Sequence, residues 1–475
     1  MHQARMTARV IRWALIASAL PIAPGLAADG APPLGAYNAD ISESSVSGIS
    51  SGAFMAVQFG VAWSSIIKGV GVIAGGPYYC AQGTAAEGLL GNLGPDLRAT
   101  GPCMQGPLPD LEPLFEKTDE WTRGGDIDDP HNIANQRIYI FSGYNDTVVA
   151  PKVGEAAYRF YLHYLGGRNN GSLFYQSAVG AGHSQVTVDY GLPCNKNEGY
   201  FIDHCNYDQA GIILQHIYGA LNPKNRDALT GKLLAFDQRE LTSPTSPASY
   251  SMAETGYLYV PASCAAQRAC RVHVAFHGCK QNVDMIEHRY IEHAGYNEWA
   301  DSNDLIILYP QTIAGNPATD PFTPLNPFGC WDWWGYTNFN YAVKAGRQIT
   351  TIKAMLDRLT SGHSGSTART AASAAPKIVV NDVSDTGAAI AWTPVADAQK
   401  YEIARTNGGD SSFIPIGSVS GLSFAELGLR PATPYQYRLT VNRNGGSEGP
   451  ASPAVTATTL PIPPRCDTPG SCPVP

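Results

Sequence analysis

The pentapeptide Gly48-Ile49-Ser50-Ser51-Gly52 is the sequence feature that most constrains how this chain can fold. The serine-rich, weakly alternating residues 41–48 before it predict a strand, and the residues 53–67 after it, which are apolar all round, predict a buried helix. A Gly-x-Ser-x-Gly turn between a strand and a helix holds its serine in a strained backbone and needs small neighbours. We therefore predict that Ser50 is a nucleophile, although an ordinary turn also fits the motif in a chain with 49 glycines.

Two further candidate residues follow predicted strands of the same sheet. The segment 70–76 completes a strand–helix–strand unit, which is typical of a parallel sheet. Asp146 lies on a turn after the predicted strand 137–141, and His183 lies on a glycine-flanked loop after the predicted strand 173–175. The order serine, acid, histidine is that of α/β-hydrolase triads.

Each of these signals also has a simpler interpretation. Asp146 is suited to capping the helix predicted to start near Pro151, and His183 is compatible with a solvated loop position. Three signals in the order of a triad outweigh these alternatives. We predict an α/β fold with the catalytic residues Ser50, Asp146 and His183.

The strand predicted over 271–276 ends in His277-Gly278-Cys279. In α/β-hydrolases the loop that donates an oxyanion-hole amide follows such a strand, but it normally precedes the serine. Here it comes far downstream of Ser50. The inversion predicts a circularly permuted sheet, in which both halves of the segment 37–359 are needed to complete one site.

Charge and the N-terminal residues restrict the partners and the location. The 475 residues carry 32 basic and 40 acidic side chains, for a formal net charge of −8, and no basic run. Neither nucleic acid nor a membrane is therefore an expected partner. Three arginines precede an apolar run over 13–23 and the small residues Ala27 and Ala28, which is the pattern of a secretory signal peptide.

Ten cysteines in an exported chain predict disulfides rather than metal ligands, and no cofactor or metal is expected. Proximity in the sequence suggests five pairs: Cys80/Cys103, Cys194/Cys205, Cys264/Cys270, Cys279/Cys330 and Cys466/Cys472.

A tryptophan-rich segment, Gly329-Cys330-Trp331-Asp332-Trp333-Trp334-Gly335, follows the predicted strand 305–309. A buried core is one interpretation of it. Alternation of Trp with Asp and Gly favours a loop, and clustered exposed aromatic side chains mark a binding surface for an apolar ligand. We therefore expect this loop to be exposed and to contact substrate.

The C-terminal part of the chain differs from the rest in composition and in its pattern of apolar residues. We predict a signal peptide over 1–28, a catalytic domain over 29–360, a flexible linker over 361–376, a small β-sandwich over 377–460 and a proline-rich tail over 461–475. The sandwich segment has an early Trp392 and the sequence Leu429-Arg430-Pro431-Ala432-Thr433-Pro434-Tyr435 before a late strand, which looks like a fibronectin type III domain. It carries no catalytic constellation, and a spacer is its simplest role.

Several motifs in register resemble extracellular poly(3-hydroxybutyrate) depolymerases, specifically the type with its serine motif near the mature N-terminus of a circularly permuted α/β-hydrolase. The matching segments are Val46 to Ala56, Ala74-Gly75-Gly76-Pro77-Tyr78, Thr255 to Pro261, His277-Gly278-Cys279-Lys280-Gln281, Tyr296 to Asp301 and Gly329 to Trp333. No feature of the segment 103–130 matches.

The resemblance implies that Ser50, rather than Ser51, is the nucleophile, that the amides of Ser51 and Cys279 form the oxyanion hole, and that Trp331 contacts substrate. It implies a secreted serine esterase acting on a polyester polymer or its oligomers. The alternatives are another secreted serine esterase on the same scaffold, acting on phenolic or synthetic polyesters, and a non-catalytic polymer-binding protein.

Overall fold

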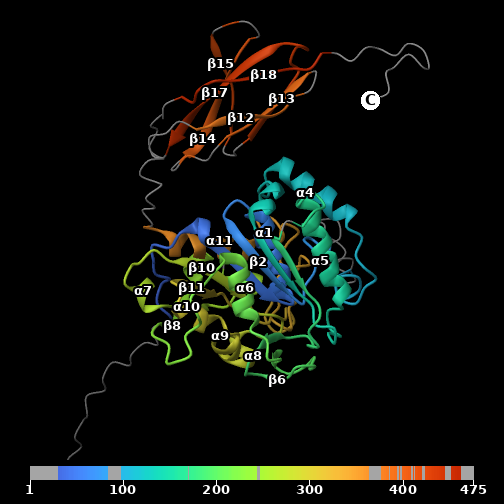
Figure 1. Ribbon diagram of the computed structural model, residues 1–475, viewed down its shortest axis with the longest axis vertical. Coiled ribbons are helices and arrows are strands. Elements are labelled where there is room, and N and C mark those ends of the chain that lie inside the picture. Colours follow the sequence, from blue (N-terminus) through green and yellow to red (C-terminus); the bar gives the residue numbers. More distant parts are fainter. Residues whose placement is uncertain are drawn as a thin grey trace, which may run out of the picture.

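A computed structural model of the chain describes residues 30–83, 98–169, 171–242, 246–362, 376–383, 386–392, 395, 398–407, 410, 412–419, 423–443 and 451–461 (Figure 1). The predicted signal peptide, most of the linker and the tail with Cys466 and Cys472 lie outside these residues. Among the described residues no helix combines the length and apolar character needed to cross a membrane.

An eight-stranded sheet with the order β4-β3-β2-β1-β10-β11-β9-β8 forms the centre of the larger domain (Figure 1). All neighbouring strands from β4 to β11 pair in parallel, whereas β9 runs antiparallel to both of its neighbours. The strands are β1 (Ser44–Ile49), β2 (Ile67–Ile73), β3 (Arg137–Phe141), β4 (Leu173–Gln176), β8 (Lys232–Asp237), β9 (Thr255–Val260), β10 (Arg271–Phe276) and β11 (Leu305–Tyr309).

The path of the chain through this sheet confirms the predicted circular permutation. The first strand lies in the middle of the sheet, and β2, β3 and β4 extend it to one edge. The chain then crosses to β8 at the opposite edge and returns until β10 pairs with β1. The strand that leads into the His277-Gly278-Cys279 loop is therefore the direct neighbour of the strand that leads into Ser50.

Hydrophobic clusters cover both faces of the sheet. Successive residues of a strand point to opposite faces, and Ile306 and Leu308 of β11 belong to one cluster, whereas Ile307 belongs to the other. The first cluster includes side chains of α1, α5 and α11, and the second includes side chains of α6, α9 and α10. The helices are α1 (Ser51–Ala62), α4 (Glu112–Gly124), α5 (Pro151–Tyr164), α6 (Gln209–Tyr218), α7 (Ala262–Ala265), α8 (Val283–Ile286), α9 (Arg289–His293), α10 (Tyr296–Asp301) and α11 (Arg347–Thr360).

Helix α1 matches the expectation of a buried helix, because all twelve of its residues are buried. The segment 80–135, which is rich in glycine, proline and charged residues, contains α4. Leu114 and Thr118 are the buried residues of α4, and Phe115 stacks on His163 of α5. Leu111, Phe115 and Trp121 pack against the first cluster as well, so the apolar side chains of this region recur at helical spacing.

A ladder of polar side chains lies between the buried strands β1 and β10. The His273 ring bonds the Ser45 hydroxyl through Nδ1 and the Ser47 hydroxyl through Nε2, each at 2.7 Å. Ser45 also bonds the Tyr218 hydroxyl, and Ser47 bonds the Tyr296 hydroxyl. These bonds explain how Ser45 and Ser47 are buried in β1, a strand that is buried at all six positions where an alternating pattern was expected.

Four of the five predicted disulfides are present: Cys80–Cys103, Cys194–Cys205, Cys264–Cys270 and Cys279–Cys330. The last of these closes the longest loop, with a sequence separation of 51 between its cysteines. It joins the loop after β10 to the tryptophan-rich segment.

The C-terminal domain is a seven-stranded sandwich with the strand orders β12-β13-β16 and β15-β14-β17-β18. Its strands are β12 (Ile378–Val383), β13 (Gly387–Trp392), β14 (Ala398–Thr406), β15 (Phe413–Val419), β16 (Ser423–Leu427), β17 (Pro434–Arg443) and β18 (Val455–Thr458). Trp392 is buried, and the Tyr435 hydroxyl accepts a hydrogen bond from the Arg430 amide, as in the tyrosine corner of such sandwiches. The fold is that of a fibronectin type III domain.

The His273 ladder predicts a pH-dependent contribution to stability. Burial lowers the pKa of His273 to about 3, whereas an unfolded histidine titrates near pH 6.5, about its ordinary value. The contribution of His273 to the free energy of unfolding is therefore complete above the unfolded-state pKa and is lost as the pH falls toward 3. In urea unfolding, we expect the stability advantage of the native protein over His273→Gln to be smaller at pH 4.5 than at pH 7. An advantage that does not change with pH would contradict this assignment.

Candidate active site

Ser50 occupies a strained turn between β1 and α1. Its backbone has φ 56° and ψ −123°. Residues other than glycine rarely adopt a positive φ of this kind. The amide of Ser50 donates to the carbonyl of Ile73 at 2.9 Å, which fixes the turn to the neighbouring strand. The geometry is that of a nucleophile elbow, which raises the serine side chain above the sheet edge.

The two glycines of the motif are required by close backbone approaches. A Cβ atom at Gly48 would lie 2.3 Å from the carbonyl oxygen of Gly52, and one at Gly52 would lie 2.3 Å from the carbonyl oxygen of His277. Both obstacles are backbone atoms, which cannot move aside as a flexible side chain can. The motif is therefore a packing requirement of the β1–α1–β10 junction rather than an ordinary turn.

Asp146 and His183 form a buried pair at the same edge of the sheet. The Asp146 Oδ2 atom lies 2.9 Å from His183 Nδ1, and both residues are about 95 % buried, with 5 % and 4 % exposed. Asp146 Oδ1 accepts from the amides of Val148 and Val149 at 2.9 and 2.8 Å. Both carboxylate oxygens are thus satisfied, and a carboxylate held in this way orients the imidazole.

The alternative interpretation of Asp146 as a helix cap does not hold, because Ala150 is the N-cap residue of α5. Ser50, Asp146 and His183 follow the carboxyl ends of β1, β3 and β4, which places all three at one edge. No hydrogen bond joins the hydroxyl of Ser50 to the ring of His183 among the described residues. In free enzymes this bond is often long and shortens in the substrate complex.

The loop after β10 lies beside Ser50. A Cβ atom at Gly278 would be 3.2 Å from the Cβ atom of Ser50. Ser51 opens α1, so its amide has no acceptor within the helix, and the amides of Ser51 and Cys279 have no acceptor among the described residues. Two backbone donors, one directly after Ser50 and one directly after Gly278, are thus available, and an oxyanion hole requires two such donors.

His277 fixes the start of this loop. Its Nδ1 donates to the carbonyl of Gly278 at 2.7 Å, and its Nε2 accepts from the amide of Thr312 at 3.3 Å. Burial lowers the pKa of His277 to about 4, so the ring is neutral at physiological pH and supports this donor–acceptor pattern. His277 is a structural residue of the loop after β10, the proposed oxyanion loop.

The tryptophan-rich segment is buried, which corrects the expectation of an exposed aromatic loop. Trp331 is fully buried, and its ring packs against Phe276 and His277 with ring centroids 5.0 and 5.5 Å apart. Trp333 stacks on Phe54 of α1 at 4.0 Å. Asp332 accepts from the amides of residues 335–337 and folds the segment inward, which sequence alternation does not reveal.

Trp331 nevertheless lies beside Ser51, the residue after the candidate nucleophile. Its amide donates to the Ser51 hydroxyl at 3.3 Å, and its indole Nε1 is buried without a hydrogen-bond partner among the described residues. Exposed apolar side chains occur instead on the preceding loop, where Phe322, Leu325 and Phe328 are 80 %, 62 % and 49 % exposed. Direct contact between Trp331 and substrate stays a prediction.

Sequence analysis missed two polar residues that support the site. The Gln281 carboxamide accepts from the amide of Gly278 at 2.7 Å and donates to the carbonyls of Tyr200 and Phe201 at 2.9 and 3.0 Å. It thereby joins the oxyanion loop to the segment whose Phe201 ring lies edge-on to His183. Gln281 belongs to the motif His277-Gly278-Cys279-Lys280-Gln281, but the motif does not indicate that its side chain joins the two segments.

Asp203 is the second missed residue. It lies on β7 (Ile202–His204), in a small three-stranded sheet with β5 (Gln185–Thr187) and β6 (Leu192–Pro193) directly after His183. Its carboxyl is fully buried, and neither oxygen has a hydrogen-bond partner among the described residues. Burial raises its pKa to about 7, because the nearby Ser184 hydroxyl, Lys196 amide and His183 ring offset only part of the cost of desolvation.

This strained serine, the buried acid–histidine pair and the two free amides on a permuted α/β-hydrolase sheet define a serine-dependent carboxylic ester hydrolase. No family model matches this chain. It is 37% identical over 459 residues to a poly(3-hydroxybutyrate) depolymerase of Delftia acidovorans, a match that covers 95% of this chain and 86% of the relative. It is 36% identical over 352 residues to a polyhydroxybutyrate depolymerase of Talaromyces funiculosus, with 72% and 97% covered.

Solved structures agree with these relatives. The crystal structure of a PHB depolymerase from Penicillium funiculosum matches with a TM-score of 0.60 at 35% identity, covering 70% of this chain and 99% of that chain. A serine-to-alanine variant of a PHB depolymerase, in complex with an R3HB trimer, matches with a TM-score of 0.59 at the same identity and coverage. The chain belongs to the poly(3-hydroxybutyrate) depolymerase family.

Asp203 predicts a pH dependence opposite to that of His273. Its folded-state pKa of about 7 lies above the ordinary value of 3.8, so its contribution to stability is complete below about pH 4 and is lost as the pH rises through 7. We expect Asp203→Asn to gain free energy of unfolding relative to the native protein between pH 4.5 and pH 7.5, as measured by urea unfolding. Parallel pH profiles of the two proteins would show that the Asp203 carboxyl does not titrate in this way.

Proposed function

We propose that this enzyme is exported and hydrolyses the ester bonds of poly(3-hydroxybutyrate), related short-chain polyhydroxyalkanoates or their oligomers to hydroxyacid units. The observation that carries the proposal is the buried Asp146–His183 pair at the sheet edge that also bears the strained Ser50. Relatives that are 35% to 37% identical and named for this activity support the choice of substrate.

In this proposal Ser50 is the nucleophile and His183 is the general base. His183 Nε2 takes the hydroxyl proton as Ser50 Oγ attacks the ester carbonyl, and the same nitrogen returns the proton to the departing alcohol. Asp146 holds Nδ1 at 2.9 Å, which fixes the tautomer and stabilises the imidazolium that forms. Water, activated by His183, then attacks the acyl-enzyme and releases the free acid.

The amides of Ser51 and Cys279 are the proposed oxyanion donors. Each contributes on the order of 3 kcal/mol to transition-state stabilisation when it is aimed at the developing charge. The bridge from Cys279 to Cys330 ties this donor to the segment of Trp331, the residue proposed to contact the substrate. Binding of the polyester and stabilisation of the oxyanion would thus be coupled through one covalent link.

Neighbouring serines provide a matched test of the nucleophile. We expect Ser50→Ala to abolish covalent labelling by a fluorophosphonate and hydrolysis of 3-hydroxybutyrate oligomers, because the attacking oxygen is lost while the fold is kept. Ser51→Ala removes only the hydroxyl that accepts from the Trp331 amide, so it should keep both labelling and hydrolysis. Hydrolysis by Ser50→Ala at the native rate would reject the triad.

The substrate is tested separately with the purified mature enzyme. Clearing of poly(3-hydroxybutyrate) granules and product analysis on the trimer and dimer are compared with turnover of phenolic esters and a synthetic polyester. Faster turnover of the phenolic or synthetic esters, with intact labelling of Ser50, would keep the serine esterase assignment but reject the polyester substrate.

Export is the remaining part of the proposal. The arginines and apolar run at the N-terminus and four disulfides in the described residues support an oxidising location outside the cytoplasm. We expect N-terminal sequencing of the mature protein from the culture medium or periplasm to begin directly after Ala27 or Ala28. Recovery of the intact N-terminus from the cytoplasmic fraction alone would contradict export.

A further inference from the structure

The acid and the base of the proposed triad lie on separate loops, whose relative position must be fixed. Asp146 follows β3 and His183 follows β4, so the sheet places the start of each loop but not its end. Near their starts the loops bond directly, from the Asn145 amide to the Ala181 carbonyl at 3.1 Å and from the Asn145 side chain to the Gly180 carbonyl at 2.8 Å. These direct bonds stop short of His183.

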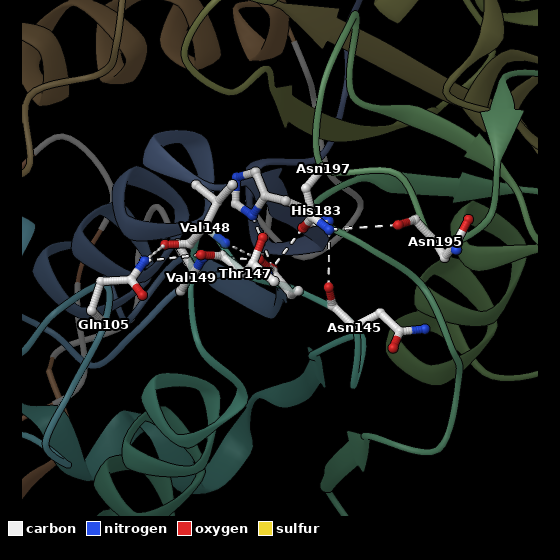
Figure 2. Close-up of polar contacts among 9 residues, drawn as sticks. Gln105, Asn145, Thr147, Val148, Val149, His183, Asn195 and Asn197 are labelled. Atoms are coloured by element: carbon white, nitrogen blue, oxygen red, sulfur yellow. Dashed lines mark hydrogen bonds and ion pairs between the residues drawn. The ribbon is translucent and has the colours of Figure 1, made fainter.

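A third segment completes the connection through one side chain (Figure 2). Asn197 Oδ1 accepts from the amide of Thr147 at 3.0 Å and from the amide of His183 at 2.9 Å. Its Nδ2 donates to the carbonyl of Asn145 at 3.0 Å. One carboxamide therefore holds the backbone on both sides of Asp146 and the backbone of His183.

Asn197 itself is anchored outside the two loops. It follows β6, where the amide of Lys196 donates to Pro193 and the carbonyl of Cys194 accepts from Gly182. The Cys194–Cys205 disulfide ties this segment to the end of β7. The carboxamide thus bonds the triad loops from a position that the small β5-β7-β6 sheet already holds.

The acid loop is supported from the other side by Gln105 (Figure 2). Its Nε2 donates to the carbonyls of Thr147 and Val148 at 3.0 and 2.7 Å. Gln105 makes no such bond to His183 in the described chain, so it supports the acid alone. Asn197 is the side chain whose bonds reach both partners.

We propose that Asn197 is a positioning residue of this enzyme, which sets the distance between Asp146 and His183 by bonding both of their loops at once. The role needs an acceptor for two amides and a donor for a carbonyl on one rigid group, and the carboxamide of asparagine supplies both. The proposal rests on the triad named above. Because Asn197 has no hydrogen bond to Ser50 or to the proposed oxyanion amides in the described part of the chain, it acts through the Asp146–His183 pair.

The effect on catalysis follows from the geometry. Catalytic groups must be held to within about 0.5 Å, and a misplacement of about 1 Å costs on the order of 100-fold in rate. We expect Asn197→Ala to lower kcat on soluble 3-hydroxybutyrate oligomers by about 10-fold to 100-fold, with KM changed less than about twofold and the melting temperature little changed, since Asn197 is half-buried. The rate of fluorophosphonate labelling of Ser50 should fall by the same factor, because labelling requires His183 but no polyester.

Two further variants separate positioning from general destabilisation. Asn197→Asp keeps the acceptor atom and the shape but loses the donor to Asn145, so its kcat should lie between those of the native enzyme and Asn197→Ala. Asn195→Ala is the matched control, because the exposed Asn195 side chain has no hydrogen bond in the described chain and contributes only its carbonyl to Asn197. Its rates should equal those of the native enzyme.

Each result decides between the proposals. Native kcat and labelling rates in Asn197→Ala would overturn the positioning role while leaving the triad intact. A parallel loss of melting temperature, KM and kcat would also overturn it in favour of a structural role. Failure of the native enzyme itself to be labelled would instead reject the triad on which this inference rests.

Discussion

The parallel pairing of β1 with β10 is the contact on which the rest of the structure depends. It places Gly48 opposite Phe276, so the end of the strand that carries Ser50 lies beside the end of the strand that carries the oxyanion loop. The approach is so close that a Cβ atom at Gly52 would meet the carbonyl of His277. The proposed nucleophile near the beginning of the domain and the proposed oxyanion donor more than 200 residues later are therefore brought to the same end of the sheet.

This pairing is specified by polar as well as apolar contacts. His273 bonds serines on both sides of Val46, and each serine bonds a tyrosine from a covering helix. A shift of one residue in the pairing would move every β1 side chain to the opposite face and break all of these bonds. A buried network in which every member is satisfied thus favours a single register, which is the register that the active site requires.

The loops around the site are held by side chains from segments that contribute no reacting atom. Gln281 joins the oxyanion loop to the segment at Phe201, and Asn197 joins the acid loop to the histidine loop. In each case a carboxamide bonds backbone groups on two different loops. Loops without regular secondary structure gain rigidity in this way. Substitution of either carboxamide side chain is therefore expected to lower the catalytic rate more than the free energy of unfolding.

The sequence by itself determined the parts of this protein that depend on local patterns. The elbow, the strands 271–276 and 305–309 and the permutation were predicted and are present, because apolar strand segments and glycine positions leave a signal within a few residues. The sequence also proposed Ser50, Asp146 and His183 as the triad, and their catalytic roles stay a prediction. The tertiary structure alone decided the burial of Trp331 and the contacts of Asn197. Both depend on hydrogen bonds and packing between segments that are distant in the sequence. Asn195 faces solvent and Asn197 bonds the loops of the proposed triad, but no periodicity distinguishes these two asparagines in the polar stretch Cys194-Asn195-Lys196-Asn197.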